Sequence, residues 1–252
     1  MRVSILFLLA SLAAVAQSSF EVATIKPTPE DWRGGRYFRM VSPTQWIATN
    51  YTPRVLIAAA YSLTPRAVEG GPSWLDSDHF DIVAATTAES QPTTEEQLAM
   101  LRALLADRFA LRFHQEQKEM PVYILSVAKG GAKLKESTQA PTDQPDIVNR
   151  VRPDGILLPA KNAGMAPFTS MLQRTVFDRP VLDKTGLTGR YDFDLEWTPD
   201  ESQFGGTVPI PGEPTKPGFF AALQEQLGLK LEATRALAPV LAIERIERPS
   251  EN

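Results

Sequence analysis

The sequence contains no cysteine and only two histidines, and both shortages limit the chemistry open to it. Without cysteine the chain has no disulfide framework, no thiol nucleophile and no iron–sulfur ligands, so a hydrophobic core must hold the fold together. His79 and His114 leave few ways to build a Ser-His-Asp triad or a histidine-based metal site. No Gly-x-Gly-x-x-Gly or Gly-Lys-Ser/Thr loop occurs. We therefore predict no metal, no cofactor and no catalytic set.

Basic residues are too few and too scattered for a nucleic-acid-binding surface. The chain has 26 Lys and Arg residues against 30 Asp and Glu residues, which gives a formal net charge of −4. Proteins that bind nucleic acids gather Lys and Arg on one face. The basic residues of Lys129–Lys135 lie beside Gly130-Gly131 and Glu136, which is typical of a solvated loop. We expect no nucleic-acid partner.

The long apolar run of the chain lies at its N-terminus. Met1-Arg2 gives a positive start, Val3–Ala13 is apolar, and Ala14-Val15-Ala16 has the form of a signal-peptide cleavage site. A transmembrane helix needs about 20 apolar residues, and Gln17-Ser18-Ser19 ends this run earlier. We interpret residues 1–16 as a signal peptide, with an uncleaved N-terminal anchor as the alternative. The mature protein is then periplasmic or extracellular in a bacterium, without a stable membrane anchor.

The second half of the chain repeats the plan of the first half. Asn50 and Asn162 are 112 residues apart, and so are Leu75 and Leu187. Each asparagine precedes a helix-like segment, and each leucine precedes a strand-like segment. This pattern predicts an internally duplicated α+β protein, in which four helix–strand–strand units form two pseudo-symmetric lobes with mainly antiparallel or mixed sheets. The pattern leaves open whether the lobes share one sheet.

Stretches rich in proline and polar residues set the expected boundaries. After the signal peptide, residues 17–136 form the first lobe, 137–149 a linker and 150–252 the second lobe. Within the second lobe, residues 198–217 contain five prolines and Gly205-Gly206 without apolar periodicity, which is typical of a long exposed loop.

Helices and strands are expected from end signals and from apolar spacing. Thr52-Pro53 favours a helix start, Thr94-Glu-Glu-Gln97 matches a capping box, and Gly228 favours a helix end. The apolar residues of the four expected helices are Leu56, Ile57 and Ala60; Leu98, Leu101, Leu104 and Leu105; Phe168, Met171, Leu172 and Val176; and Phe219, Leu223 and Leu227. The expected strands are Phe20–Ile25, Tyr37–Trp46, Ala67–Glu69, Phe80–Ala84, Ala110–Gln115, Val122–Ala128, Val151–Leu158, Pro180–Asp183, Tyr191–Trp197, Leu229–Leu231 and Val240–Ile246.

Asp183-Lys184-Thr185-Gly186 matches two catalytic motifs whose context is missing. Asp-Lys-Thr-Gly carries the phosphorylated aspartate of P-type ion pumps, which need many membrane spans. Lys-Thr-Gly also resembles the third box of penicillin-binding proteins and β-lactamases, but the Ser-x-x-Lys at Ser126–Lys129 lies in an expected strand instead of opening a helix. We interpret the motif as a turn between paired strands, in which Gly186 and Gly189 permit positive φ.

The remaining candidate residues are acidic or aromatic. His114-x-Glu116 places two potential metal ligands on one strand face, but no third ligand is spaced to complete a site. Asp192, Asp194 and Glu196 alternate as on a solvent-facing strand. The four tryptophans that could line a ligand groove are Trp32, Trp46, Trp74 and Trp197, of which we expect Trp74 to be the most exposed. The candidate binding residues are Trp74, Asp76, His79, Asp183, Lys184, Thr185 and Tyr191.

Longer motifs give a family resemblance. These motifs are Phe20–Pro27, Gly70–Ile82, Leu104–Phe109, Lys118–Tyr123, Val127–Gly130, Arg179–Phe193, Ala222–Leu231 and Glu247–Asn252. Together they resemble the "Soli" paralogues, an exported family of unknown function expanded in Acidobacteria. The resemblance implies export, a full-length domain and no established active site. Related domains fused behind membrane metallopeptidases that look like β-lactam sensor-transducers imply a sensing or interaction role. The helix–strand–strand units are more loosely similar to the small N-terminal domains of secretins and TonB-dependent receptors.

Our leading hypothesis is a non-catalytic, exported binding or interaction module of the cell envelope, whose partner is an envelope protein or a small ligand. Sheet edges and residues 198–217 would be its contact surfaces, with strand addition as one mode. One alternative is a secreted hydrolase of cell-wall or plant polymers, which would use carboxylates near Asp76–Asp81 and Asp183–Asp194. The other is a sensor module that binds a small wall fragment.

Overall fold

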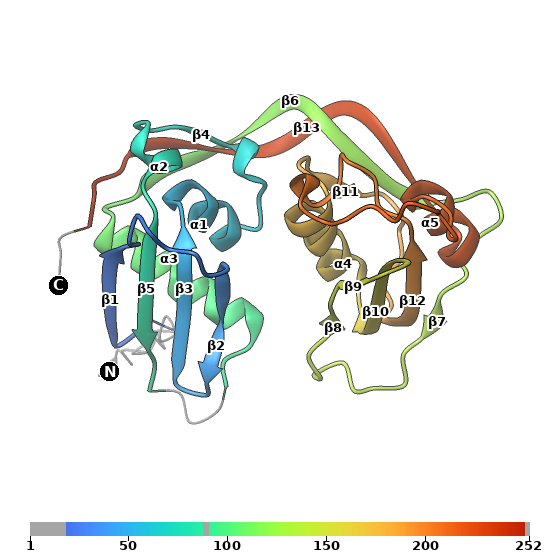
Figure 1. Ribbon diagram of the computed structural model, residues 1–252, viewed down its shortest axis with the longest axis horizontal. Coiled ribbons are helices and arrows are strands. Elements are labelled where there is room, and N and C mark those ends of the chain that lie inside the picture. Colours follow the sequence, from blue (N-terminus) through green and yellow to red (C-terminus); the bar gives the residue numbers. More distant parts are fainter. Residues whose placement is uncertain (1–18, 88–90, 250–252) are drawn as a thin grey trace, which may run out of the picture.

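Two lobes lie side by side beneath a long two-stranded ribbon, as Figure 1 shows. The computed structural model describes residues 19–87 and 91–249. Over these residues the fold is α+β, with three sheets that are mainly antiparallel. The signal peptide predicted at residues 1–16 lies outside the described residues.

The first lobe is built on an antiparallel sheet in the order β1-β5-β3-β2. Its elements are β1 (Val22–Pro27), β2 (Tyr37–Ser42), β3 (Gln45–Tyr51), α1 (Pro53–Ala60), the 3₁₀ helix η1 (Pro65–Ala67), β4 (Val68–Gly70), α2 (Trp74–Ser77), β5 (Phe80–Ala85) and α3 (Thr94–Arg108). Trp46 and Ile82 of the sheet are buried against Leu56 of α1 and Leu101 of α3. The helices therefore cover one face of the sheet and form the first hydrophobic core with it.

The second lobe has a sheet in the order β7-β12-β10-β8, with β9 also paired to β10. Its elements are β7 (Lys135–Glu136), β8 (Asp146–Ile147), β9 (Arg150–Arg152), β10 (Gly155–Ala163), α4 (Met165–Met171), the π-helix η2 (Leu172–Val176), β11 (Val181–Asp183), β12 (Tyr191–Trp197), the 3₁₀ helix η3 (Phe204–Gly206) and α5 (Phe219–Leu227). In β12, Leu195 and Trp197 are fully buried, whereas Asp194 between Phe193 and Leu195 is exposed. This confirms the predicted alternation.

A third sheet joins the lobes. Strand β6 (Arg112–Val127) pairs antiparallel with β13 (Leu229–Arg245) along nearly the whole of both strands. The first lobe adds β4 parallel to β13, and the second lobe adds β11 parallel to β6. The order of this sheet is β11-β6-β13-β4, so the two lobes share a sheet.

The shared ribbon makes the lobes exchange strands. Leu241 of β13 belongs to the first core, and Tyr123 and Leu125 of β6 belong to the second core. In addition, β7 and β8 both pair within the second-lobe sheet, although the sequence placed β7 in the first lobe and β8 in the linker. The expected boundaries at residues 136 and 149 therefore do not divide the chain into two contiguous domains.

The ribbon also changes the second and fourth predicted units. The expected strands Ala110–Gln115 and Val122–Ala128 form the single strand β6, and Leu229–Leu231 and Val240–Ile246 form the single strand β13. Each unit thus has one long strand after its helix. The middle of the ribbon crosses between the lobes, where Leu237 is 64% exposed. Because no core faces this part, its sequence lacks the apolar alternation from which a strand is predicted.

Helix ends follow the sequence signals with one shift. Pro53 opens α1, and Gly228 ends α5 with a φ of 64°. The capping box of α3 begins at Thr93, one residue before the predicted Thr94. The Thr93 N–H donates to the Glu96 carboxylate at 2.7 Å, and the Glu96 N–H donates to the Thr93 hydroxyl at 3.3 Å. Both groups at the helix start are thereby satisfied.

The two halves of the chain share an order of elements. Apart from short helical turns, β2-β3-α1-β4-β5-α3-β6 in the first half has the same order of strands and helices as β9-β10-α4-β11-β12-α5-β13 in the second. The internal duplication itself stays an inference from the sequence pattern.

Candidate binding site between the lobes

A cleft of about 590 Å³ lies between the two lobes. Its first-lobe wall is formed by Ser62 and the start of α3, and its second-lobe wall by α4, η2 and residues 141–147. Clefts between domains are frequent ligand sites, because two surfaces enclose a small molecule better than one. The cleft is therefore a candidate binding site.

Direct polar contacts tie the two lobes together. The Gln173 side chain in η2 donates to the Ser62 carbonyl of the first lobe at 2.6 Å and accepts from the Val181 N–H at 3.1 Å. Arg66 of the first lobe forms an ion pair with Asp178 of the second, with 2.8 Å between Nη2 and Oδ2. Both partners of this pair are exposed, so the pair contributes about 1 kcal/mol or less. Gln173, the Arg66–Asp178 pair and the ribbon thus connect the two lobes.

Two arginines in the cleft form no ion pair with another described residue. The Arg174 Nε donates to the Ser170 carbonyl at 3.2 Å, and the Arg190 Nη1 donates to the Asn162 carbonyl at 3.3 Å. Burial lowers the pKa of Arg174, and the nearby Tyr51 acts in the opposite direction. A guanidinium group still remains protonated at neutral pH. The cleft thus contains two cations that form no ion pair with a described carboxylate, and one unpaired carboxylate, Asp143, in the same lining.

The acidic residues of the cleft are partly engaged elsewhere. Glu95 forms an ion pair with Arg102, with 2.7 Å between Oε1 and Nη2. The Asp143 carboxylate accepts the Ala140 N–H at 3.2 Å and has no cationic partner within the described segments. The apolar lining residues are Leu98, Pro141, Pro145, Ile147, Pro167 and Met171. The cleft therefore suits a small ligand that combines an anionic group with an apolar part.

Trp74 and Asp76, which were predicted to bind, are held in contacts within the first lobe. Trp74 is only 8% exposed, and the guanidinium of Arg248 lies 5.0 Å from the centre of its ring system. The expectation that it would be the most exposed tryptophan is wrong, because α2 packs it into the core, and Trp32 is the more exposed one. Asp76 accepts two bonds from Arg54, at 2.6 Å from Nε and 2.9 Å from Nη2, and the bond lowers the pKa of Asp76.

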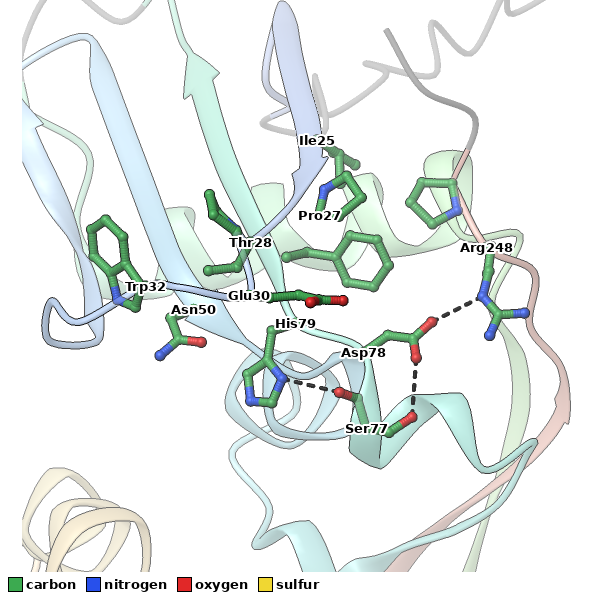
Figure 2. A pocket seen from close by; sticks show the side chains of 13 residues that line it. Ile25, Pro27, Thr28, Glu30, Trp32, Asn50, Ser77, Asp78, His79 and Arg248 are labelled. Atoms are coloured by element: carbon green, nitrogen blue, oxygen red, sulfur yellow. Dashed lines mark hydrogen bonds and ion pairs between the residues drawn. The ribbon is translucent and has the colours of Figure 1, made fainter.

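His79 lines a second pocket, of about 580 Å³, in the first lobe (Figure 2). Its Nδ1 lies 3.1 Å from the Ser77 carbonyl oxygen. The neighbouring Asp78 carboxylate accepts a bond from Arg248 Nε at 2.9 Å, which lowers the pKa of Asp78. Asn50, at the end of β3, lines the same pocket. Of the predicted binding residues, His79 is the one that lines either of these two cavities.

The other predicted residues belong to the second lobe. Asp183 Oδ1 accepts from the Thr185 N–H at 2.8 Å and from its hydroxyl at 2.7 Å, and Gly186 has a φ of 70°. The Lys184 N–H donates to the main chain of β6 at 2.8 Å. The predicted turn is present, but β11 and β12 on its two sides lie in different sheets and do not pair. Tyr191 is buried in the second core. The structure does not gather the seven predicted residues into one site.

The histidine and glutamate of the ribbon form surface contacts. His114 Nδ1 lies 2.9 Å from Glu244 Oε1 on the neighbouring strand, and Glu116 lies 3.0 Å from Lys118 Nζ. Within residues 19–87 and 91–249, no group of three or more His, Asp or Glu residues is arranged to hold a metal ion. In the same two segments, no helix has the length and apolar character needed to cross a membrane.

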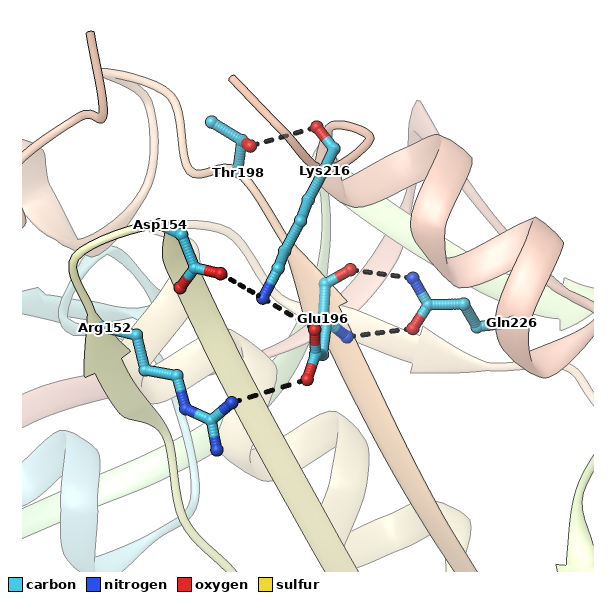
Figure 3. A network of polar contacts seen from close by, with 6 residues as sticks. All are labelled: Arg152, Asp154, Glu196, Thr198, Lys216 and Gln226. Atoms are coloured by element: carbon cyan, nitrogen blue, oxygen red, sulfur yellow. Dashed lines mark hydrogen bonds and ion pairs between the residues drawn. The ribbon is translucent and has the colours of Figure 1, made fainter. Parts of the chain in front are cut away.

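The proline-rich loop 198–217 is fastened at its base (Figure 3). Lys216 Nζ lies 2.6 Å from Glu196 Oε2 and 3.0 Å from Asp154 Oδ2, and the Thr198 hydroxyl donates to the Lys216 carbonyl at 3.0 Å. Gln226 of α5 forms two bonds to the main chain of Glu196, at 2.9 and 2.7 Å. The bonds to Glu196 and then Asp154 raise the pKa of Lys216. The base of the loop is thereby held against β12 and against the turn between β9 and β10.

The first part of this loop is also part of the core. The Trp197 Nε1–H donates to Gln203 Oε1 at 2.7 Å, and Phe204 stacks on Trp197 with 6.2 Å between ring centres. Gln203 is buried, whereas most residues from Gly205 onward are exposed. The predicted long exposed loop is therefore exposed over most of its length, whereas its two ends are held by polar bonds and one aromatic contact.

A family model matches most of the chain. Its description is a protein of unknown function (DUF3738), and the match covers residues 54–246. The chain belongs to the DUF3738 family. The match runs from α1 through the end of β13 and so includes the cleft, the ribbon and nearly all of the second lobe. No curated protein and no solved structure matches the chain significantly.

Sequence reasoning missed the cleft in this family domain. Arg174 belongs to no motif, Arg190 lies in the motif Arg179–Phe193 but was not singled out as a candidate, and residues 141–147 had the composition of a linker. The cleft exists because the ribbon sets two lobes opposite each other, and no local pattern reports that arrangement. Asn50 was signalled in advance by its 112-residue spacing from Asn162, although not as a pocket residue.

Proposed function

We propose that this DUF3738 protein is an exported, non-catalytic binding module of the bacterial cell envelope that holds a small anionic ligand between its lobes. The observation that carries the proposal is the cleft, in which Arg174 and Arg190 have no carboxylate partner among the described residues. Export rests on the signal-peptide pattern of residues 1–16.

The geometry of the cleft supports a particular ligand class. Carboxylate and phosphate groups form strong, paired hydrogen bonds with guanidinium groups. Leu98 and Met171 provide apolar surface on opposite walls for the rest of the ligand. A volume of about 590 Å³ accommodates a small molecule or a few amino acids. A small peptide fragment of the cell wall, with a free carboxylate and short apolar side chains, has this chemistry.

The hydrolase alternative would use carboxylates near Asp76–Asp81 and Asp183–Asp194. A glycoside hydrolase needs two carboxylates on either side of the scissile bond, about 5–10 Å apart. Asp76 is bound by Arg54, and Asp183 is bound by the turn that follows it. The two groups also belong to different lobes. No observation favours the hydrolase over the binding module.

The test uses the mature chain, residues 17–252, and a panel of N-acetylated tripeptides of alanine, leucine and glutamate. Each peptide is prepared with a free C-terminal carboxylate and as the C-terminal amide. We expect some carboxylate peptides to raise the melting temperature and to give saturable heats in calorimetry, while their amides bind at least about tenfold more weakly.

Matched variants assign the effect to the cleft. Arg174→Gln and Arg190→Gln should each remove most of the stabilisation by the carboxylate peptides. Arg235→Gln makes the same change in net charge on the exposed ribbon, where Arg235 binds Glu119, and should leave the stabilisation intact. Equal losses in all three variants would contradict the cleft as the site, and cleavage of the peptides in mass spectra would contradict a non-catalytic role.

A further inference from the structure

The same irregularity lies near the end of one inner strand in each lobe, β3 in the first and β10 in the second. The pairing of β3 with β5, and of β10 with β12, shifts in register within the last residues of β3 and β10. Each shift contains an asparagine with a left-handed backbone, Asn50 with a φ of 61° and Asn162 with a φ of 51°. Their main-chain N–H groups donate to Asp81 and Asp192, both at 2.9 Å. The two asparagines therefore occupy equivalent positions.

The chain beside each turn is also equivalent. Strand β1 lies antiparallel to β5 at the edge of the first-lobe sheet. In the same way, β7 lies antiparallel to β12 at the edge of the second-lobe sheet. Just after β1, the Thr28 hydroxyl donates to Asp81 at 2.7 Å, and just after β7, the Ser137 hydroxyl is near enough to Asp192 to help lower its pKa. The Thr28 N–H donates to the carbonyl of His79, just before β5, at 2.9 Å. The Ser137 N–H donates to the carbonyl of Arg190, just before β12, at 2.8 Å. The segments that follow can be compared directly.

In the second lobe, the following segment closes over the asparagine. Asn162 is fully buried, and its Nδ2 donates to the carbonyl oxygens of Ala140 at 3.0 Å and Asp143 at 2.8 Å. The Asp143 N–H donates to the Ala140 carbonyl at 3.0 Å, so the bound segment is a tight turn. The amide of Asn162 thus holds a peptide main chain by two of its carbonyl groups.

In the first lobe, the equivalent place is open. The chain after Thr28 forms its own turn, in which the Trp32 N–H donates to the Pro29 carbonyl at 3.0 Å. A pocket of about 580 Å³ is lined by this turn and by Asn50 (Figure 2). The side chain of Asn50 has no hydrogen-bond partner in the segments that the structure describes, and the buried Trp32 Nε1–H has none either. The first lobe therefore lacks the main-chain carbonyls that its twin position binds.

We propose that the Asn50 pocket binds the main chain of a short peptide turn from another protein, as Asn162 binds residues 140–143. The Asn50 amide presents the same two N–H donors to carbonyl oxygens. Ile25, Pro27 and Phe80 provide apolar walls for small side chains. The Arg248–Asp78 pair neutralises two charges at the pocket, which leaves the Glu30 carboxylate as the acidic group in its lining without an ion pair among the described residues.

This site is distinct from the cleft between the lobes, because the two cavities share no lining residue. Asn50 and His79 lie in one lobe and need no movement of the other. The proposal therefore does not depend on the anionic ligand proposed above, and a failure of either leaves the other standing.

The probe is an acetylated and amidated heptapeptide with the sequence of residues 138–144, Thr-Gln-Ala-Pro-Thr-Asp-Gln. It is titrated to millimolar concentration into the ¹⁵N-labelled mature chain, and the indole N–H signal of Trp32 is followed. The tethered segment of the chain itself competes at Asn162 with a high effective concentration, so the free peptide is directed to the open pocket. We expect a saturable shift of the Trp32 signal.

Three variants decide the assignment. Asn50→Gly keeps the left-handed turn and removes the amide, and Asn50→Asp keeps the shape but replaces the donors by acceptors; both should weaken binding by about tenfold or more. Asn162→Gly is the matched control and should bind the peptide at the Trp32 signal with unchanged affinity. The proposal is overturned by the absence of a saturable shift in the wild type, or by Asn50 variants that both bind the peptide with wild-type affinity.

Discussion

Replacing Asn162 by glycine is expected to lower the free energy of unfolding by about 2 kcal/mol. The change removes two hydrogen bonds from Nδ2 to the carbonyls of Ala140 and Asp143, each of which contributes about 1 kcal/mol. The Ala140 carbonyl keeps its bond from the Asp143 N–H, whereas the Asp143 carbonyl loses the partner that Asn162 gave it. It also removes Oδ1, which is buried without a partner in the described chain, and this offsets part of the loss. Glycine adopts the φ of 51° without strain, so the backbone adds little.

Asn50→Gly is the matched comparison at the equivalent position. Its side chain makes no hydrogen bond within the described residues, so we expect a loss of about 0.5 kcal/mol or less, mainly from the greater freedom of glycine in the unfolded chain. Alanine at either position adds a left-handed backbone penalty of about 1 kcal/mol. The difference between the two glycine variants therefore isolates the contacts of the Asn162 amide.

Urea unfolding of the mature chain, followed in parallel by tryptophan fluorescence and circular dichroism, measures these free energies. Coincident transitions are required before the values are compared, because a two-lobed protein can unfold in steps. The reasoning is refuted if Asn50→Gly and Asn162→Gly cost the same, or if Asn162→Gly costs less than about 0.5 kcal/mol.

Three further predictions concern the core, the acid response and the loop. Leu158→Ala, in the second core, should cost about 2–5 kcal/mol in urea unfolding, whereas Val151→Ala at a surface position should change stability by about 0.5 kcal/mol or less; similar effects would contradict the assigned core. The Asn162 N–H and then the Ser137 hydroxyl lower the pKa of Asp192, so its contribution is present above its ordinary pKa near 4 and is lost as the pH falls through the lowered value. Asp192→Asn should flatten the fall in urea midpoint below about pH 4, and an unchanged slope would show that Asp192 is not responsible. Lys216→Met should release the base of loop 198–217 and speed its cleavage by elastase several-fold in limited proteolysis. An unchanged rate would show that the ion pairs do not restrain the loop.

Elements that face one core along their whole length were predictable from the sequence. The strand Tyr191–Trp197 was predicted at its observed ends, because its apolar side chains alternate toward the second core. Helix α5 was predicted from Phe219, Leu223 and Leu227, and its end from Gly228. In both cases burial is local, so the period of the sequence reports the element directly.

Elements that cross from one environment to another were not predictable in full. Strand β6 packs on the first core near Phe113 and enters the second core at Val122–Leu125, whereas the segment between them is mostly exposed or only partly buried. For the same reason the cleft could not be anticipated, since Arg174 meets the first lobe only through the tertiary arrangement. Asn50 and Asn162 were visible as a repeated pair, but which of them is covered depends on how the next segment folds.

The exchange of strands in the ribbon controls when the protein can fold. Strand β13 is the last strand of the described chain, and its Leu241 completes the core of the first lobe. The first core is therefore complete only after the C-terminal part of the chain has been made. Contacts over so large a sequence separation also make folding slow. Such a delay suits a polypeptide that must be threaded through a membrane before it becomes compact, as the predicted signal peptide of residues 1–16 requires.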